Sequence, residues 1–100
     1  MEKTIEEVVS VHPFVLVDFY ATWCEPCKWV VPVLENVQLH FKEKLSVQKI
    51  DVDEHAESAR ELKIMSVPTL VLFHHGKEVW RMRGFDTAPK LIRIFEEIIK

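Results

Sequence analysis

The stretch FYATWCEPCKWVVP (residues 19–32) holds the only two cysteines of this 100-residue chain, Cys24 and Cys27, with two residues between them. It overlaps the end of FVLVDFY (14–20), a continuous apolar run that is typical of a strand buried on both faces. Beyond the first cysteine, apolar residues recur with helical spacing. A buried strand that leads into a helix predicts an α/β fold. The cysteine pair at the junction is a disulfide staple, a metal clamp or a redox reagent.

The composition indicates one globular domain, which we expect to span residues 1–100. Hydrophobic residues make up 48% of the chain, and only two residues are glycine. The net charge of −3 is mild and the basic residues form no run, which argues against a nucleic-acid partner. No apolar stretch reaches the ~20 residues that span a bilayer, and the acidic start MEKTIEEVVSV is unlike a secretory signal. We therefore expect a cytoplasmic protein without a membrane partner, unless a leader has been removed.

The expected compartment favours a redox role for the two cysteines. Cytoplasmic thiols are kept reduced, and a staple between Cys24 and Cys27 would close a very short loop, where cross-links stabilise least. A structural zinc ion usually takes four ligands, but the chain has no second pair of this kind and its five histidines are scattered. We predict no metal site, and we expect His74 and His75 in a solvated loop. The staple and the metal clamp remain alternatives to a dithiol that cycles between reduced and oxidised forms.

The spacing of the hydrophobic residues predicts the order of helices and strands. Helices are expected around residues 5–9, from 24 to about 43, at 54–63, and after Thr87, which should cap the last of them. Strands are expected at 14–20, 45–52, 69–75 and 77–83, the last two as a hairpin around Gly76. Pro32 should kink the second helix, because proline lacks the N–H that the helix needs. With a right-handed parallel crossover between the first two strands, the result is a mixed sheet with helices on both faces.

Cys24 would lie where the buried strand meets the N-terminus of the second helix. Free N–H groups and the positive end of the helix dipole stabilise a thiolate at that point, and the thiolate is the nucleophile of disulfide exchange. Cys27 is nearly one turn further along and should lie deeper. Cys24 is therefore the expected attacking thiol, and Cys27 the thiol that resolves the mixed disulfide.

The segment VDFYATWCEPCK resembles the active-site signature of the thioredoxin family, whose usual form is WCGPCK. MSVPTLVLFHHGKEV is similar to the family segment in which a cis-proline precedes a strand and a glycine turn. The resemblance extends from about Phe14 to Lys100. It implies a thioredoxin fold and an enzyme of cell redox homeostasis and electron transport, which reduces protein disulfides through Cys24 and Cys27. It also implies no bound cofactor, a monomer, disulfide-containing protein substrates and a separate recycling enzyme of the thioredoxin reductase type.

Carried over by position, the resemblance assigns four residues to substrate binding. Trp23 would shield the cysteines and offer an apolar contact surface, whereas its alternative is ordinary core packing. Pro68 would follow a cis peptide bond and leave the backbone of Val67 open to an extended substrate. A trans proline that starts a strand is the alternative there. Gly84 falls where the family has a glycine close to the site.

The resemblance also matches Asp18 and Lys49 to a buried aspartate and its lysine neighbour. A carboxylate inside a buried strand should have a raised pKa, and a nearby ammonium group would offset part of that rise. Asp18 could then accept the proton of Cys27 during resolution, directly or through a water molecule. The alternative is a solvated Asp18 near the end of the strand.

Two features depart from the family pattern. Glu25 stands where the family usually has glycine. We expect Glu25 and Pro26 to tune the redox potential, with the carboxylate raising the pKa of Cys24 and making the pair more reducing unless solvent screens it. The chain before Phe14 is short, so we expect the first strand of the family to be absent. Residues 45–52 would then form an edge strand whose backbone groups are open to a partner or a second copy.

Two other functions compete with a protein-disulfide reductase. One is a thioredoxin-like binding or scaffold module in which the redox chemistry is incidental. The other is an oxidase or isomerase of an oxidising compartment. The intact cysteine pair, with Trp23, Asp18 and Pro68, favours the reductase over the module. A proline rather than a histidine before Cys27 argues against the oxidase.

Overall fold

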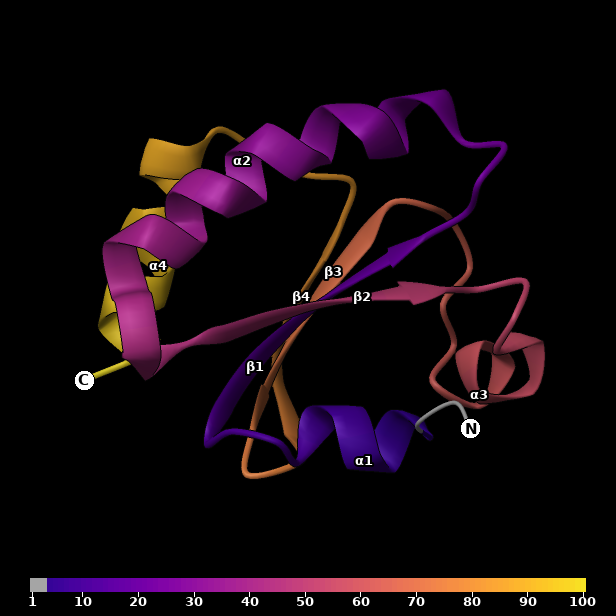
Figure 1. Ribbon diagram of the computed structural model, residues 1–100, viewed down its shortest axis with the longest axis horizontal. Coiled ribbons are helices and arrows are strands. Elements are labelled where there is room, and N and C mark those ends of the chain that lie inside the picture. Colours follow the sequence, from indigo (N-terminus) through magenta and orange to yellow (C-terminus); the bar gives the residue numbers. More distant parts are fainter. Residues whose placement is uncertain (1–3) are drawn as a thin grey trace.

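The computed structural model describes residues 4–100 and has the order of elements expected from the sequence (Figure 1). The elements are α1 (Ile5–Val9), β1 (Phe14–Tyr20), α2 (Glu25–Phe41), the 3₁₀ turn η1 (Lys42–Lys44), β2 (Ser46–Asp51), α3 (Ala56–Glu61), β3 (Thr69–His74), β4 (Lys77–Arg83) and α4 (Ala88–Ile98). Among the helices of this described part of the chain, none is both long and apolar enough to cross a membrane.

The four strands form one mixed sheet in the order β2-β1-β3-β4. β1 pairs in parallel with β2 and antiparallel with β3, and β3 pairs antiparallel with β4. Helices α2 and α4 cover one face of the sheet, and α1 and α3 lie on the other side (Figure 1). β1 is therefore enclosed by strands on both edges and by helices on both faces, which explains its continuous apolar sequence.

The side chains of β1 alternate between the two halves of the core. Val15, Val17 and Phe19 belong to the cluster that includes the apolar side of α1, whereas Leu16 belongs to the cluster formed with α2 and α4. Successive strand residues point to opposite faces, so Asp18 lies on the same face as Leu16. The one acidic residue of this buried strand is thereby directed toward α2.

Two helices differ from the prediction, α2 at its end and α3 at its beginning. The second ends at Phe41 as an α-helix, because Lys42 has a positive φ of 52° and the chain continues as a 3₁₀ turn. The third begins at Ala56 rather than at residue 54. There the side chain of Asp51 accepts a hydrogen bond from the backbone N–H of Asp53 at 2.8 Å, which holds a turn after β2. α2 is continuous through Pro32, and its axis bends along its length in Figure 1.

The expected hairpin forms between β3 and β4. His75 and Gly76 make the turn with φ values of 50° and 82°, the left-handed conformation that tight hairpins require. The ring of His74 stacks on that of Phe14 with centroids 4.1 Å apart, and His75 is exposed. The expectation of a solvated loop therefore holds for His75, whereas for His74 it is wrong, because His74 is the half-buried last residue of β3.

β2 is an edge strand of the sheet, as expected, but part of that edge is occupied. Gln38 of α2 accepts a hydrogen bond from the backbone N–H of Val47 at 2.9 Å and donates one to the carbonyl of Leu45 at 2.6 Å. The expectation of a fully open edge is therefore wrong for its first residues. The first strand of the family was expected to be absent. From residue 4 onward no strand precedes α1, and residues 1–3 lie outside the described part of the chain.

Candidate active site

The cysteine pair lies at the N-terminus of α2, directly after the end of β1. Cys24 is the N-cap residue in an extended conformation, and its Sγ accepts a hydrogen bond from the backbone N–H of Cys27 at 3.2 Å. Glu25 and Pro26 form the start of the helix, where proline removes an N–H that would have no partner. The first turn thus directs a backbone donor and the positive end of the helix dipole at the sulfur of Cys24.

In the structure Cys24 and Cys27 are joined by a disulfide bond, with their Cα atoms 5.4 Å apart. Each cysteine is only 5% exposed, so the expectation that Cys27 lies deeper than Cys24 does not hold for this oxidised form. What distinguishes the two sulfurs is the helix cap, because the Cys24 sulfur occupies the capping position. Within residues 4–100, no cluster of three or more His, Cys, Asp or Glu side chains could hold a metal ion.

Trp23 directly precedes Cys24 and is 70% exposed, so the alternative of ordinary core packing is wrong. Its indole Nε1–H donates a hydrogen bond to Oδ2 of Asp53 at 2.8 Å. Asp53 lies in the turn that the buried side chain of Asp51 holds in place. This hydrogen bond fixes the exposed ring of Trp23 to the loop after β2, and it joins residues that are 30 positions apart in the chain.

We predict that Asp53→Ala weakens substrate binding by releasing the indole of Trp23. The lost hydrogen bond is worth about 0.5–1.5 kcal/mol, so KM for a protein disulfide should rise about 2-fold to 10-fold with kcat nearly unchanged. The indole N–H resonance of Trp23 should also exchange faster with water. Asp53→Asn, which keeps a carbonyl oxygen at that place, is the matched control. Equal KM values in the alanine variant and the parent would show that the contact has no part in binding.

The segment before β3 lies next to the cysteines and has the expected backbone. The Val67–Pro68 peptide bond is cis, so the alternative of a trans proline is wrong. Val67 packs against the small cluster of Ala21, Cys24 and Cys27. Gly84, with a φ of 82°, donates its N–H to the carbonyl of Pro68 at 2.7 Å. Val67 therefore contacts the cysteine cluster, and Gly84 is joined through a hydrogen bond to the buried Pro68 that follows Val67.

Asp18 is fully buried, which excludes the alternative of a solvated strand end. Neither oxygen of its carboxylate has a hydrogen-bond partner within the described chain. Burial raises the pKa of Asp18 from 3.8 to about 6, and the positive charge of Lys49 offsets part of that rise. Lys49 is the register partner of Asp18 on β2. A carboxyl with such a pKa gains and loses a proton close to neutral pH, as a proton acceptor for a thiol must.

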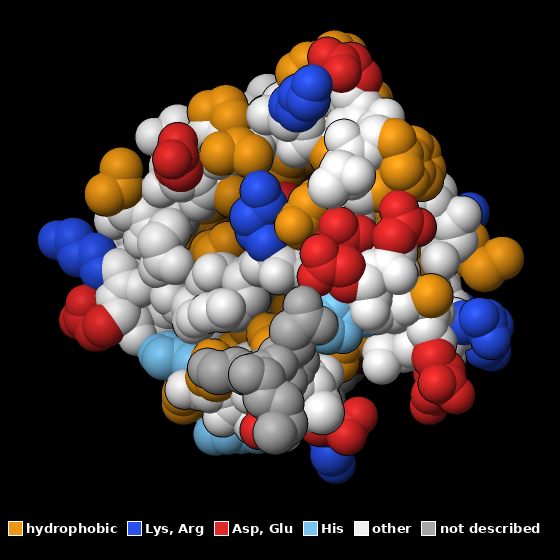
Figure 2. Space-filling view, turned by 45° about the vertical axis from the view of Figure 1, so that its right-hand side comes forward, with side chains coloured by type: hydrophobic (Ala, Val, Ile, Leu, Met, Phe, Trp, Pro, Cys, Tyr) orange, Lys and Arg blue, Asp and Glu red, His pale blue; other side chains and the backbone are white. Residues whose placement is uncertain are grey.

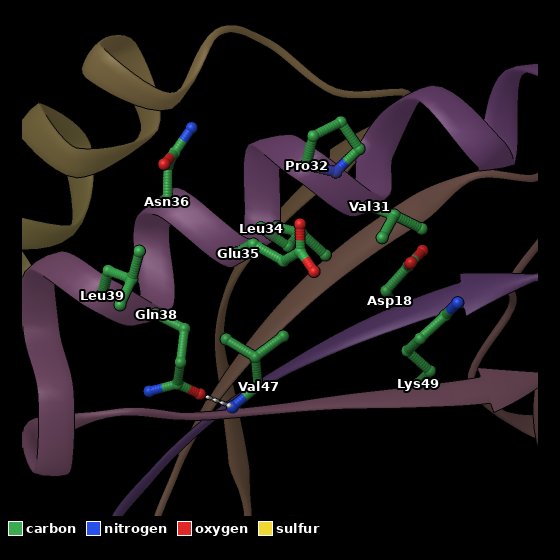
Figure 3. Close-up of a pocket in the computed structure, with 10 residues that line it drawn as sticks. All are labelled: Asp18, Val31, Pro32, Leu34, Glu35, Asn36, Gln38, Leu39, Val47 and Lys49. Carbon is green, nitrogen blue, oxygen red and sulfur yellow. Dashed lines mark hydrogen bonds between the residues drawn. The ribbon is translucent and has the colours of Figure 1, made fainter.

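A mostly apolar groove of about 750 Å³ leads along α2 and the β2 edge, and Asp18 and Lys49 lie in its lining. Figure 2 shows hydrophobic side chains gathered in a hollow on this face, with one basic side chain across it. In Figure 3 the Asp18 carboxylate points from β1 toward Val31 of α2, and Lys49 rises from β2. The groove therefore lies next to a carboxyl that the protein encloses.

Glu25 is exposed and its carboxylate contacts the ammonium group of Lys28 at 3.1 Å. The positive charge beside it cancels part of its field, and solvent screens the remainder. The field of Glu25 at the cysteine pair is therefore weaker than that of an unpaired carboxylate.

We predict that Glu25→Gly makes the couple less reducing by no more than about 15 mV, because an exposed charge about 7 Å from the sulfur contributes about 0.6 kcal/mol at the dielectric constant of water. The reduction potential is measured by equilibration with a glutathione or dithiothreitol buffer. Lys28→Met is the matched control, because it frees the same carboxylate and should make the couple more reducing. An unchanged or lower potential in Glu25→Gly would contradict a redox role for this residue.

Known proteins are similar to this chain in both sequence and fold. The sequence model of the thioredoxin family matches residues 1–97. A thioredoxin from Mycobacterium bovis is 43% identical over 93 residues, which are 93% of this chain and 80% of that protein. The solved structure of a mutant thioredoxin from Halobacterium salinarum has a TM-score of 0.85 at 36% identity, covering 100% of this chain and 87% of the other. The four-stranded mixed sheet with flanking helices is thus the thioredoxin fold.

One further relative is longer. The bifunctional thioredoxin reductase/thioredoxin of Mycobacterium leprae is 43% identical over 93 residues, which are 93% of this chain and 20% of that protein. Taken with the Cys24–Cys27 bond at the start of α2, the comparisons identify a thiol–disulfide oxidoreductase. The chain belongs to the thioredoxin family.

Proposed function

We propose that this oxidoreductase works as a reductant of protein disulfides, with Cys24 as the attacking thiol. The observation that supports this most strongly is the hydrogen bond from the Cys27 N–H to the Cys24 sulfur at the cap of α2. The same donor and the helix dipole would stabilise the Cys24 thiolate once the pair is reduced. The thiolate forms a bond to one sulfur of the substrate disulfide, and the other substrate sulfur leaves as a thiolate that takes a proton from solvent.

The mixed disulfide is then resolved by Cys27. Its sulfur attacks the Cys24 sulfur, the bond to the substrate breaks, and the second substrate sulfur leaves as a thiolate. Two electrons have moved from the chain to the substrate, and the chain is left with the Cys24–Cys27 bond of the structure. We propose that Asp18 accepts the proton of Cys27 in this step, with Lys49 modulating its pKa. The burial and missing hydrogen-bond partners of the carboxylate support this role.

The substrate would bind beside the disulfide as an extended peptide. Trp23 offers an exposed apolar ring, and Pro68 places the backbone of Val67 at the edge of the cysteine cluster. Gly84 holds the neighbouring loop through its bond to Pro68. An extended peptide could pair with the backbone of Val67, so that recognition depends little on the sequence of the substrate.

Recycling requires a source of two electrons for the Cys24–Cys27 disulfide. We propose a separate enzyme of the thioredoxin reductase type, which would make the chain a carrier in an electron-transport sequence. The Mycobacterium leprae relative, whose name joins a thioredoxin reductase and a thioredoxin, supports this pairing. We further propose that residues 1–100 act as one monomeric domain in the cytoplasm, without a bound cofactor.

Reduction of insulin with dithiothreitol as the electron source tests the proposed function. The reduced chain should make the insulin B chain precipitate well before it does with dithiothreitol alone. A chain that only binds or supports partners would give no acceleration. The reduction potential of the pair separates a reductant from an oxidase or isomerase, because an oxidase has a much less negative potential.

A further inference from the structure

The ammonium group of Lys49 lies over the ring of Tyr20, with Nζ 4.7 Å from the ring centroid. This placement is unexpected, because Asp18 is the register partner of Lys49 and carries the opposite charge. Within the described part of the chain the Asp18 carboxylate has no hydrogen-bond partner, and no ion pair joins it to Lys49. The lysine therefore acts on the carboxylate through space while its head group contacts an aromatic face.

The strand geometry explains how Tyr20 comes to lie within reach of Lys49. Asp18 and Tyr20 are two positions apart on β1, so their side chains project from the same face of the sheet. The long stem of Lys49, which starts beside Asp18 on β2, extends along that face. Tyr20 also packs against the cluster of Ala21, Cys24 and Cys27, so its ring is fixed between the cysteines and the lysine.

We propose that Tyr20 is a positioning residue, whose ring holds the Lys49 ammonium group away from the Asp18 carboxylate. A direct ion pair would keep the carboxylate ionised down to low pH, and Asp18 could then not accept a proton near neutrality. The ring offers the ammonium group an alternative contact and so preserves the proton affinity of Asp18. The role of that proton in resolving the mixed disulfide rests on the proposed function, whereas the placement of Lys49 does not.

Other ionisable groups also lie around Tyr20, Lys49 and Asp18, and the variants used in the test leave these groups unchanged. They are Glu35 of α2 in the lining of the groove, Cys27 of α2, Asp51 of β2 and Glu54 in the turn that follows. Burial raises the pKa of Tyr20, and the carboxylates of Asp51, Glu54 and Asp18 raise it further, so the phenol stays neutral. In the oxidised protein the cysteines do not titrate. The titration of the Asp18 carboxyl can therefore be followed without a contribution from the thiols.

The experiment follows the Cγ resonance of Asp18 by ¹³C NMR in the oxidised protein, from about pH 4 to about pH 9. In Tyr20→Leu the ammonium group of Lys49 is free to approach within about 4–6 Å of the carboxylate, so the midpoint should fall by about 1 pH unit or more. In Tyr20→Phe the aromatic face is kept and the midpoint should match that of the parent. The methylene protons beside Nζ of Lys49 should be shifted upfield by the ring in the parent and lose that shift in Tyr20→Leu.

A second background separates positioning from packing. In Lys49→Met the ammonium group is absent, so adding Tyr20→Leu should leave the Asp18 midpoint unchanged. A fall of the same size in that background would show that the ring acts through packing, and would overturn the proposal. So would an unchanged midpoint in Tyr20→Leu, or no ring-induced shift of the Lys49 protons in the parent. These readouts need no turnover, so a chain that fails to reduce insulin would refute the proposed function and leave this inference to be decided by NMR.

Discussion

Cys24→Ser is expected to abolish disulfide reduction, whereas Cys27→Ser should leave a chain that attacks a substrate and cannot release it. The sulfur at the helix cap receives the backbone donor, so its replacement by a hydroxyl removes the nucleophile itself. Turnover should fall by on the order of 10³-fold or more in either variant, since both sulfurs act in one sequence. The two failures differ in kind, because only Cys27→Ser completes the first exchange.

Mass spectrometry distinguishes these outcomes after incubation with an oxidised protein substrate. Cys27→Ser should gain the mass of the substrate, and a reducing agent should remove it. Cys24→Ser should gain little or nothing. The reverse pattern would mean that Cys27 attacks first, and it would contradict the role assigned to the helix cap. The double variant, which has no thiol, controls for noncovalent adducts.

Asp18→Asn is expected to make the oxidised protein more stable than its parent at neutral pH. An isolated buried carboxylate prefers the unfolded state, where water solvates its charge. A rise of its pKa from 3.8 to about 6 corresponds to about 3 kcal/mol lost from the free energy of unfolding at pH values above both. The loss develops as the pH rises from about 4 to about 6, because in that range the folded state binds the proton more tightly than the unfolded state.

Urea denaturation of both oxidised proteins at about pH 4 and about pH 7.5 tests this prediction. The stability of the variant relative to the parent should increase by about 2–3 kcal/mol between the two pH values. The buried amide of the asparagine carries its own cost, which is the same at both pH values and cancels from the comparison. Parallel stability curves for variant and parent would show that Asp18 is not the buried, unpaired acid that the structure describes.

The sequence alone was sufficient for the features that depend on local pattern. The apolar run of β1, the cysteine pair at the start of α2 and the turn at Gly76 each carry a physical signal within a few residues. The oddity of Asp18 within FVLVDFY likewise predicted a raised pKa, and the structure confirms its burial. The capping box of Thr4 and Glu7 at the start of α1 is a local pattern of the same kind.

The remaining contacts join residues far apart in the chain, and no local pattern marks them. Asp53 is one acid among several after β2, and only the fold places it under Trp23. The local sequence places Tyr20 at the end of a buried strand. Its contact with Lys49 depends on the parallel pairing of β1 with β2. The late start of α3 also depends on one side chain, because Asp51 holds the preceding turn.

The amide of Gln38 has a consequence for how the molecule behaves among other copies of itself. A side-chain amide offers the same donor and acceptor as a peptide group. The carbonyl of Leu45 and the N–H of Val47 are therefore already hydrogen-bonded to Gln38, and an incoming strand could not pair with them. At this edge of the sheet, a growing fibril would have to begin on the remainder of β2, beside the charge of Lys49. One glutamine on the neighbouring helix thus shortens the stretch of backbone that this edge of the sheet offers to an incoming strand.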